Sequence, residues 1–233
     1  MTASSRLPLW FKVGYTLWVV AWVILYKRFV GWHHFLWMCH LANVLVAVGL
    51  WLESPLILSW QALAVLVGDL VWCLDFALGL TLGQTPLGSA WYMFSAKFEP
   101  LQKSLALFHL VMPVMLIALL LKFGYDRRAL LLQAATCAVL FPISFLVSKR
   151  EDNINWVLGP FGQVEMVQEL MSPMAFLFVA IALYMAALYV PSHLVLMALV
   201  RRPNNSLAAS RSRDDGIVVA ITSERDAASG KDH

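Results

Sequence analysis

The sequence has little charge. Of its 233 residues only 13% are Asp, Glu, Lys or Arg, and 61% are hydrophobic. Soluble globular chains carry about 25% charged residues, and a water-soluble domain of this size would not cover its surface with so few. The composition therefore predicts an integral membrane protein of the cell membrane that crosses it several times.

Cysteine is also scarce, and the net charge is only +3. Cys39, Cys73 and Cys137 each lie in an apolar segment, without metal-knuckle spacing or a paired pattern, so no disulfide framework is expected. The basic residues form no continuous face, so we predict no nucleic-acid partner.

A cleavable signal peptide is not evident either. The first apolar stretch contains Lys12 and ends without a small-residue cleavage site, and we interpret it as a retained helix.

Long apolar runs are abundant. A spanning helix needs about 20 mostly apolar residues, and six stretches qualify. We predict an all-α, polytopic fold with six transmembrane helices in one bundle. Ser54-Pro55 is a favourable helix opening, because proline is tolerated in a first turn. Pro191 predicts a kink, because its ring removes a backbone donor. The expected helices cover 9–26, 32–52, 55–80, 104–122, 129–147 and 172–200.

The chain divides into a transmembrane domain over 1–200 and a polar tail over 201–233, which we expect to be disordered. Two long linkers, 81–103 and 148–171, mix apolar, Gly, Pro and charged residues, and linkers of this length are often functional. The distribution of Lys and Arg slightly favours both termini on the cytoplasmic side.

Polar residues inside apolar helices are costly and usually face a bundle interior or a cavity. In six alternating helices, the start of the second, the end of the third, the start of the fourth and the end of the fifth share one side. We therefore expect one group of polar residues to converge in one leaflet, beside both linkers. This group contains Cys39, His40, Asn43, Asp75, His109 and the run Glu151-Asp152-Asn153-Ile154-Asn155.

Helical spacing adds two expectations. His33, His40 and Asn43 lie at i, i+7 and i+10, so on one helix they share a face. Asp69 and Asp75 are six residues apart and point to different faces, so they do not suggest a paired-carboxylate site. A simpler interpretation of any one such residue is a bond to a neighbouring helix, which contributes about 0.6 kcal/mol on average.

The sequence contains no clear metal-binding motif. His33-His34 followed by His40 does not match the histidine boxes of membrane desaturases. A zinc site built from His33, His40 and His109 is geometrically possible, but we predict no metal and no cofactor.

A thiol and a histidine that activates it fit the spacing better. Cys39 is the candidate nucleophile and His109 the candidate base, with His40 and Asn43 beside them in the catalytic group. Asparagine side chains can orient the histidine or stabilise an oxyanion. The candidate substrate-binding residues are Asp75, Asn153, Asn155 and Trp156.

Three short segments, Leu36-Trp37-Met38-Cys39-His40, Leu107-Phe108-His109 and Asn155-Trp156, resemble a known pattern. It is that of the six-helix family of androgen-induced fatty-acid ester hydrolases and related transmembrane acyltransferases. The resemblance implies that Cys39 is the nucleophile and His109 the base. The proline usual before the cysteine motif is missing, and His40 is additional.

A second resemblance is to uncharacterised bacterial membrane proteins. This resemblance implies no activity for the present chain. The segments that carry it are Tyr92-Met93-Phe94, Ser104-Leu105-Ala106-Leu107-Phe108-His109, Gly124-Tyr125-Asp126-Arg127-Arg128 and Pro191-Ser192-His193.

Three functions remain open from the sequence. The first is a lipid-active acyl hydrolase or acyltransferase, with membrane lipids as its partners. The second is a small transporter or channel-like protein with Asp69, Gln61 and Gln133 along its path. The third is a non-catalytic membrane or assembly protein, and a membrane-protein partner or self-association stays open.

Overall fold

The computed structural model describes residues 6–160 and 163–200, and all regular secondary structure in these residues is helical. The predicted all-α class is therefore confirmed for this part of the chain. The predicted tail, 201–233, lies outside the described residues.

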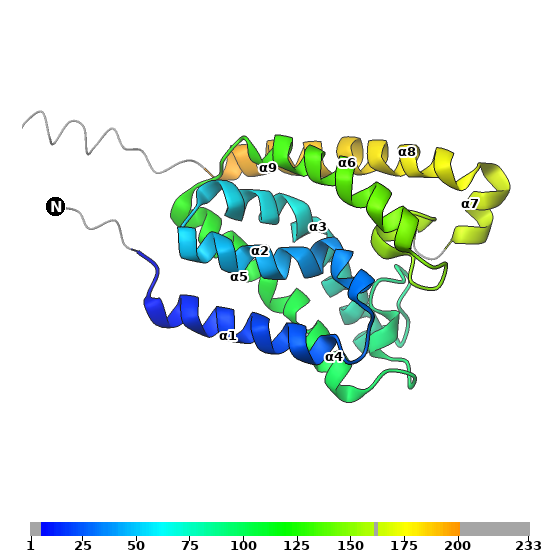
Figure 1. Ribbon diagram of the computed structural model, residues 1–233, viewed down its shortest axis with the longest axis horizontal. Helices are drawn as coiled ribbons and strands as arrows, with labels where there is room; N and C mark the ends of the chain where they lie inside the picture. The colour runs from blue at the N-terminus through cyan, green and yellow to red at the C-terminus, as the bar shows by residue number, and fades with distance from the viewer. Residues whose placement is uncertain (1–5, 161–162, 201–233) are drawn as a thin grey trace, which may run out of the picture.

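The principal helices lie lengthwise beside one another and alternate in direction (Figure 1). Short 3-10 turns, η1 (Trp32–Leu36), η2 (Trp91–Met93) and η3 (Ile154–Trp156), occur in the connections. A π-helical segment, η5 (Tyr184–Tyr189), joins the last two helices. The α-helices are α1 (Leu9–Tyr26), α2 (Met38–Leu52), α3 (Pro55–Leu82), α4 (Pro100–Ala106), α5 (Phe108–Phe123), α6 (Ala129–Val147), α7 (Val164–Leu170), α8 (Pro173–Leu183) and α9 (Val190–Leu199).

Several of these helices fit a membrane protein. Within 6–160 and 163–200, five helical stretches are long and apolar enough to cross a membrane. They are Leu9–Tyr26, Pro55–Leu82, Pro100–Phe123, Ala129–Val147 and Pro173–Leu199. The α2 helix is apolar but has only 15 residues, fewer than the about 20 that a span needs.

The expected second helix over 32–52 is wrong in its first third. Residues 32–36 form η1, Trp37 is extended (φ −57°, ψ 133°), and the α-helix begins only at Met38. The Asn155 side-chain oxygen accepts the backbone N–H of Met38 at 2.9 Å, so a residue distant in sequence caps this helix start. His33 therefore does not lie on the same helix as His40 and Asn43.

Local sequence signals set other helix boundaries. Pro55 and Pro173 each occupy the first turn, and the hydroxyls of Ser54 and Ser172 accept a backbone N–H there. Pro191 was expected to kink the last helix. The π-helical segment η5 ends two residues before it, and Pro191 lies in the first turn of α9, where its ring is tolerated.

The α3 helix is the centre of the bundle and packs against α2, α5 and α6. Its neighbours bury apolar side chains against it, including Leu50, Leu116 and Phe141. Leucines on the outer faces of α1, α6 and α9 are exposed, as expected of lipid-facing helices.

The two long linkers lie at one end of the bundle, beside α4 and α7, and we call this the linker end (Figure 1). The short turns between α2 and α3 and between α5 and α6 lie at the other end. The bundle therefore has one end of short turns and one end with enough chain to build a site.

Candidate functional site

A cavity of about 480 Å³ occupies the linker end and reaches into the bundle. Its volume is within the range of about 300–1,000 Å³ that small-molecule sites have. We call four helix residues that line it, Cys39, His40, Asp69 and His109, the cavity floor. Four residues from the connecting segments, His34, Asp152, Asn153 and Trp156, form what we call the cavity mouth.

Asp69 on α3 is a buried carboxyl group with an incomplete set of partners. Its side chain is 2% exposed, and its Oδ2 atom has no hydrogen-bond partner. Its Oδ1 atom lies 3.9 Å from Nε2 of His109. A carboxylate without partners in an apolar interior costs several kcal/mol, and such groups in membrane helices usually mark a functional path or site. Asp69 is therefore the most costly polar group of the cavity floor.

His109 has a defined proton position. Its Nδ1 lies 2.7 Å from the Ala106 carbonyl, which can only accept, so Nδ1 carries the proton and Nε2 has the lone pair. The helix break makes this possible: α4 ends at Ala106, and the Leu110 N–H bonds the Leu107 carbonyl instead of that of Ala106. The ring stacks on Trp72, with centroids 4.7 Å apart.

The two cavity-floor residues on α2, His40 and Cys39, differ in how many contacts hold their side chains. The Nδ1 of His40 lies 2.8 Å from the His34 carbonyl, which fixes its proton in the same way, and its ring contacts Trp22 and Tyr26. Cys39 is a free, partly buried thiol. The thiol bonded to His109 is that of Cys73, which donates to the His109 carbonyl at 3.3 Å, and within the described residues Cys39 has no bond to His109. The predicted nucleophile and the predicted base therefore line one cavity, as His40 does, but they are not hydrogen-bonded to each other.

Asn43 and Asp75 are absent from the described cavity lining. Tyr15 donates its hydroxyl to the side-chain oxygen of Asn43 at 2.9 Å, which links α1 to α2. The Asp75 carboxylate accepts the backbone N–H groups of Leu87, Ser89 and Ala90 at 2.8–2.9 Å. These contacts make Asp75 an anchor for the linker after α3.

Asn153 and Asn155 line the cavity, but structural bonds engage their side chains. Asn155 donates to the Leu36 carbonyl at 2.8 Å and to the Ser144 hydroxyl at 3.0 Å. Asn153 donates to the Gly159 carbonyl and accepts the Leu158 N–H.

The backbone of this turn is strained. Asn153, Asn155 and Trp156 have φ values of +37°, +52° and +52°. Asparagine adopts left-handed backbone readily, whereas a bulky tryptophan does so rarely. The surrounding structure therefore imposes this conformation on the cavity mouth.

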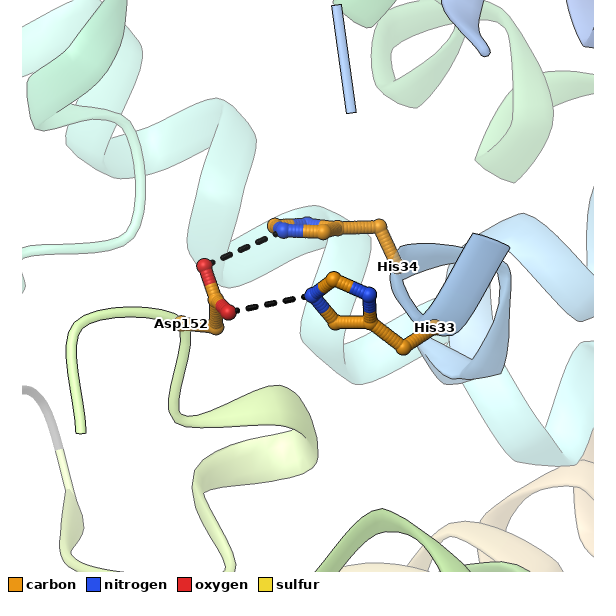
Figure 2. Close-up of side chains that lie close together, drawn as sticks. All are labelled: His33, His34 and Asp152. Carbon is orange, nitrogen blue, oxygen red and sulfur yellow. Dashed lines mark hydrogen bonds and ion pairs between the residues drawn. The ribbon is translucent and has the colours of Figure 1, made fainter. Parts of the chain in front are cut away.

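Two histidines and one carboxylate meet beside the mouth, and their spacing in the sequence does not group them. Nε2 of His33 lies 3.1 Å from one carboxylate oxygen of Asp152, and Nε2 of His34 lies 3.1 Å from the other (Figure 2). Burial lowers the pKa of His34, and the Asp152 carboxylate opposes that shift. The only sequence signal was that Asp152 belongs to the polar run after the fifth predicted helix.

Several polar residues elsewhere have structural partners. At the end with the short turns, the Tyr125 hydroxyl lies 2.8 Å from Nδ1 of His193, and Lys12 pairs with Glu53 at 2.6 Å. Gln133 accepts a bond from Trp60, whereas the amide nitrogen of Gln61 has no partner. Neither glutamine lines the described cavity.

Comparison with protein-family models, curated proteins and solved structures found no match. Both family resemblances therefore stay predictions, and the functional argument depends on the cavity itself.

Proposed function

We propose that this protein is a lipid-active membrane enzyme that hydrolyses or transfers an acyl group at the cavity floor. One observation carries the proposal. A single cavity is lined by a thiol, a histidine with an unprotonated Nε2 and a buried carboxyl group beside that histidine, namely Cys39, His109 and Asp69. A nucleophile and a base are the parts that acyl transfer requires, and the Ala106 carbonyl at Nδ1 orients the base.

In the first step, the Cys39 thiol gives its proton to Nε2 of His109, and the thiolate attacks the carbonyl carbon of a lipid ester. A carbon–sulfur bond forms, the ester carbon–oxygen bond breaks, and the leaving alcohol takes the proton from His109. Asp69 stabilises the transient imidazolium, because its Oδ1 lies 3.9 Å from Nε2.

In the second step, water or an acceptor hydroxyl gives its proton to His109 and attacks the thioester. The acyl group leaves with that oxygen, and the thiol regains a proton. The two reactants need to approach, since thiol and imidazole are not hydrogen-bonded. Such contacts often tighten only when substrate binds.

The cavity suits an acyl substrate because its lining combines apolar side chains with the polar floor. Val65, Phe141 and Leu188 supply apolar surface. Helices with lipid-exposed faces surround the cavity, so a membrane lipid is the available source of an ester.

The test is labelling of the purified, full-length chain in lipid nanodiscs with a thiol-directed acyl probe, together with turnover of fluorogenic fatty-acid esters. We expect Cys39→Ala to abolish both signals. His109→Ala should lower turnover by about 10²–10⁴-fold, the usual contribution of a general base. Cys137→Ala is the matched control, because Cys137 is buried and absent from the described cavity lining.

Labelling that survives Cys39→Ala unchanged would overturn the proposal. An effect of Cys39→Ala and His109→Ala on stability alone would also overturn it, and would favour a non-catalytic membrane protein.

A second candidate is transport, and its supporting observation is Asp69. An intramembrane acid that lines a cavity often marks an ion or proton route. This candidate predicts solute or proton flux in liposomes that Asp69→Asn abolishes and Cys39→Ala leaves intact. Flux that is indifferent to Asp69→Asn would exclude it.

A further inference from the structure

A cluster beside the cavity mouth consists of three potential metal ligands from two distant segments. His34 and Asp152 line the cavity, and His33 lies next to them. His33 and His34 come from η1, and Asp152 comes from the linker after α6, more than a hundred residues later. Their side chains are 31%, 20% and 21% exposed, so each is partly buried yet reachable from solvent. Figure 2 shows both imidazole rings pointing at the same carboxylate.

The two segments are held together independently of these three side chains. Asn155 bonds both the Leu36 carbonyl and the Met38 N–H, so it clamps the end of η1 to the turn that carries Asp152. Gly31 provides room for the His33 ring, because a Cβ atom at that position would lie 2.6 Å from it. Ligands on a fixed frame favour a metal site, because ion binding then needs little further ordering.

The separations are close to those of a metal site. Ligand atoms at 2.0–2.1 Å around a tetrahedral zinc ion lie about 3.3 Å from one another. The two nitrogen–oxygen distances are both 3.1 Å but end on different oxygens of the carboxylate, and one ligand atom from each of the three residues lies within 4.8 Å of the others. Small side-chain rotations would place an ion among them.

We propose that His33, His34 and Asp152 bind a divalent transition-metal ion of the zinc type at the cavity mouth. Each imidazole binds the ion through Nε2 and carries its proton on Nδ1. Two imidazoles select such ions over Mg²⁺ and Ca²⁺, which prefer all-oxygen sites. Three protein ligands leave one position for water or for an anionic oxygen of a ligand entering the cavity.

The competing explanation is a latch of hydrogen bonds, in which Asp152 only ties η1 to the linker. The two explanations differ in one requirement. A latch needs donors facing Asp152, whereas a metal site needs nitrogen lone pairs. His33→Gln and His34→Gln separate them, because glutamine can still donate a hydrogen bond to the carboxylate but provides no imidazole ligand.

The experiment uses full-length protein purified in detergent with a tag that contains no histidine, stripped of metal with EDTA. Zn²⁺ affinity is measured by competition with a chromogenic chelator, and Co²⁺ binding by its visible spectrum. We expect one Zn²⁺ ion per chain, bound at least about 100-fold more tightly than Mg²⁺.

Asp152→Asn and the double variant His33→Gln, His34→Gln should each weaken Zn²⁺ binding by about 100-fold or more. Glu151→Gln is the matched control, because it neutralises the adjacent exposed carboxylate and should leave binding unchanged. Gel filtration and tryptophan fluorescence verify folding. If Asp152→Asn does not fold, the double glutamine variant still tests the site.

The absence of saturable Zn²⁺ binding would overturn the inference, and so would equal affinities of Asp152→Asn and Glu151→Gln. Variants that lose only thermal stability, in a wild type that binds no metal, would identify the latch. The result is separable from the acyl chemistry, because Cys39→Ala should bind Zn²⁺ like the wild type whether or not esters are hydrolysed.

Discussion

Two carboxylates on the same helix, Asp69 and Asp75, have opposite surroundings. Asp75 is fully buried at the linker end of α3 and accepts three backbone N–H groups and the hydroxyl of Ser89. Asp69 is nearly as buried, but it faces the cavity, and one of its oxygens has no partner.

The difference separates a structural group from a candidate functional one. Burial of Asp75 is offset by its bonds, and its loss would release a linker. Burial of Asp69 is not offset within the described residues, so the fold retains a costly group beside His109. Burial alone therefore does not distinguish a candidate functional carboxylate from a structural one. The distinction is whether its oxygens have hydrogen-bond partners.

The largest expected effect is that of Asp75→Ala. It leaves three backbone N–H groups, one buried and two part-buried, without an acceptor, and we expect the free energy of unfolding to fall by about 3 kcal/mol or more. Denaturation in mixed micelles of SDS and a mild detergent measures it. Ser89→Ala is the control and should cost only about 1 kcal/mol, because it removes a single hydroxyl bond. Equal costs for the two variants would contradict the role of Asp75 as an anchor.

Next in size is Asn155→Ala, which removes bonds to Leu36, Met38 and Ser144. We expect a loss of about 2 kcal/mol in the same assay, because part-buried backbone groups at Leu36 and Met38 and the buried Ser144 hydroxyl lose their partner. Asn43→Ala is the matched asparagine control. Its amide nitrogen already has no partner, so its cost should be smaller. A larger loss for Asn43→Ala would show that the bonds of Asn155 to Leu36 and Met38 stabilise the fold less than the Tyr15–Asn43 bond does.

Asp69→Asn should change stability far less than Asp75→Ala. It removes a potential buried charge and breaks no hydrogen bond within the described residues, so we expect a change within about 1 kcal/mol, in the direction of higher stability. Under the proposed function, the same variant loses ester turnover. A loss of stability as large as that of Asp75→Ala would show that Asp69, like Asp75, mainly stabilises the fold.

The smallest effect concerns the end with the short turns. A hydrogen bond from Lys12 holds the pKa of the Glu53 carboxyl below its usual range. A lowered folded-state pKa stabilises the protein above the unfolded pKa, and this contribution is lost as pH falls through the folded pKa. The thermal midpoint should therefore fall slightly on acidification, and less so in Glu53→Gln. An identical pH dependence in both proteins would exclude this ion pair as a cause.

The sequence predicted the helices best where local signals act. The boundaries of Leu9–Tyr26 and Ala129–Val147 match the predicted ranges, and Ser54-Pro55 and Ser172-Pro173 open helices as expected. The second helix was wrong at its start, because a distant side chain, Asn155, fixes the backbone at Met38. The sixth span is not established, since α2 has 15 residues.

For the site, depth along the helices placed Cys39, His40 and His109 at one end, and all three line the cavity. The depth of a residue along its helix does not predict which way its side chain points around the helix axis. Asn43 and Asp75 lie at the expected depth, but their side chains bond Tyr15 and the linker after α3. Asp69 was considered for a transport path and not as a neighbour of His109, because that contact depends on how α3 packs against α5.

The sequence by itself determined the class of protein, because apolar length and scarce charge are properties of the chain that no packing alters. It also determined that the long linkers share one end, since alternating helices leave no other arrangement. Only the tertiary structure decided which polar groups acquire partners. His33, His34 and Asp152 meet, and Asp69 lacks a partner for one oxygen, because helix rotation and a distant clamp set these contacts, and neither is encoded in local spacing.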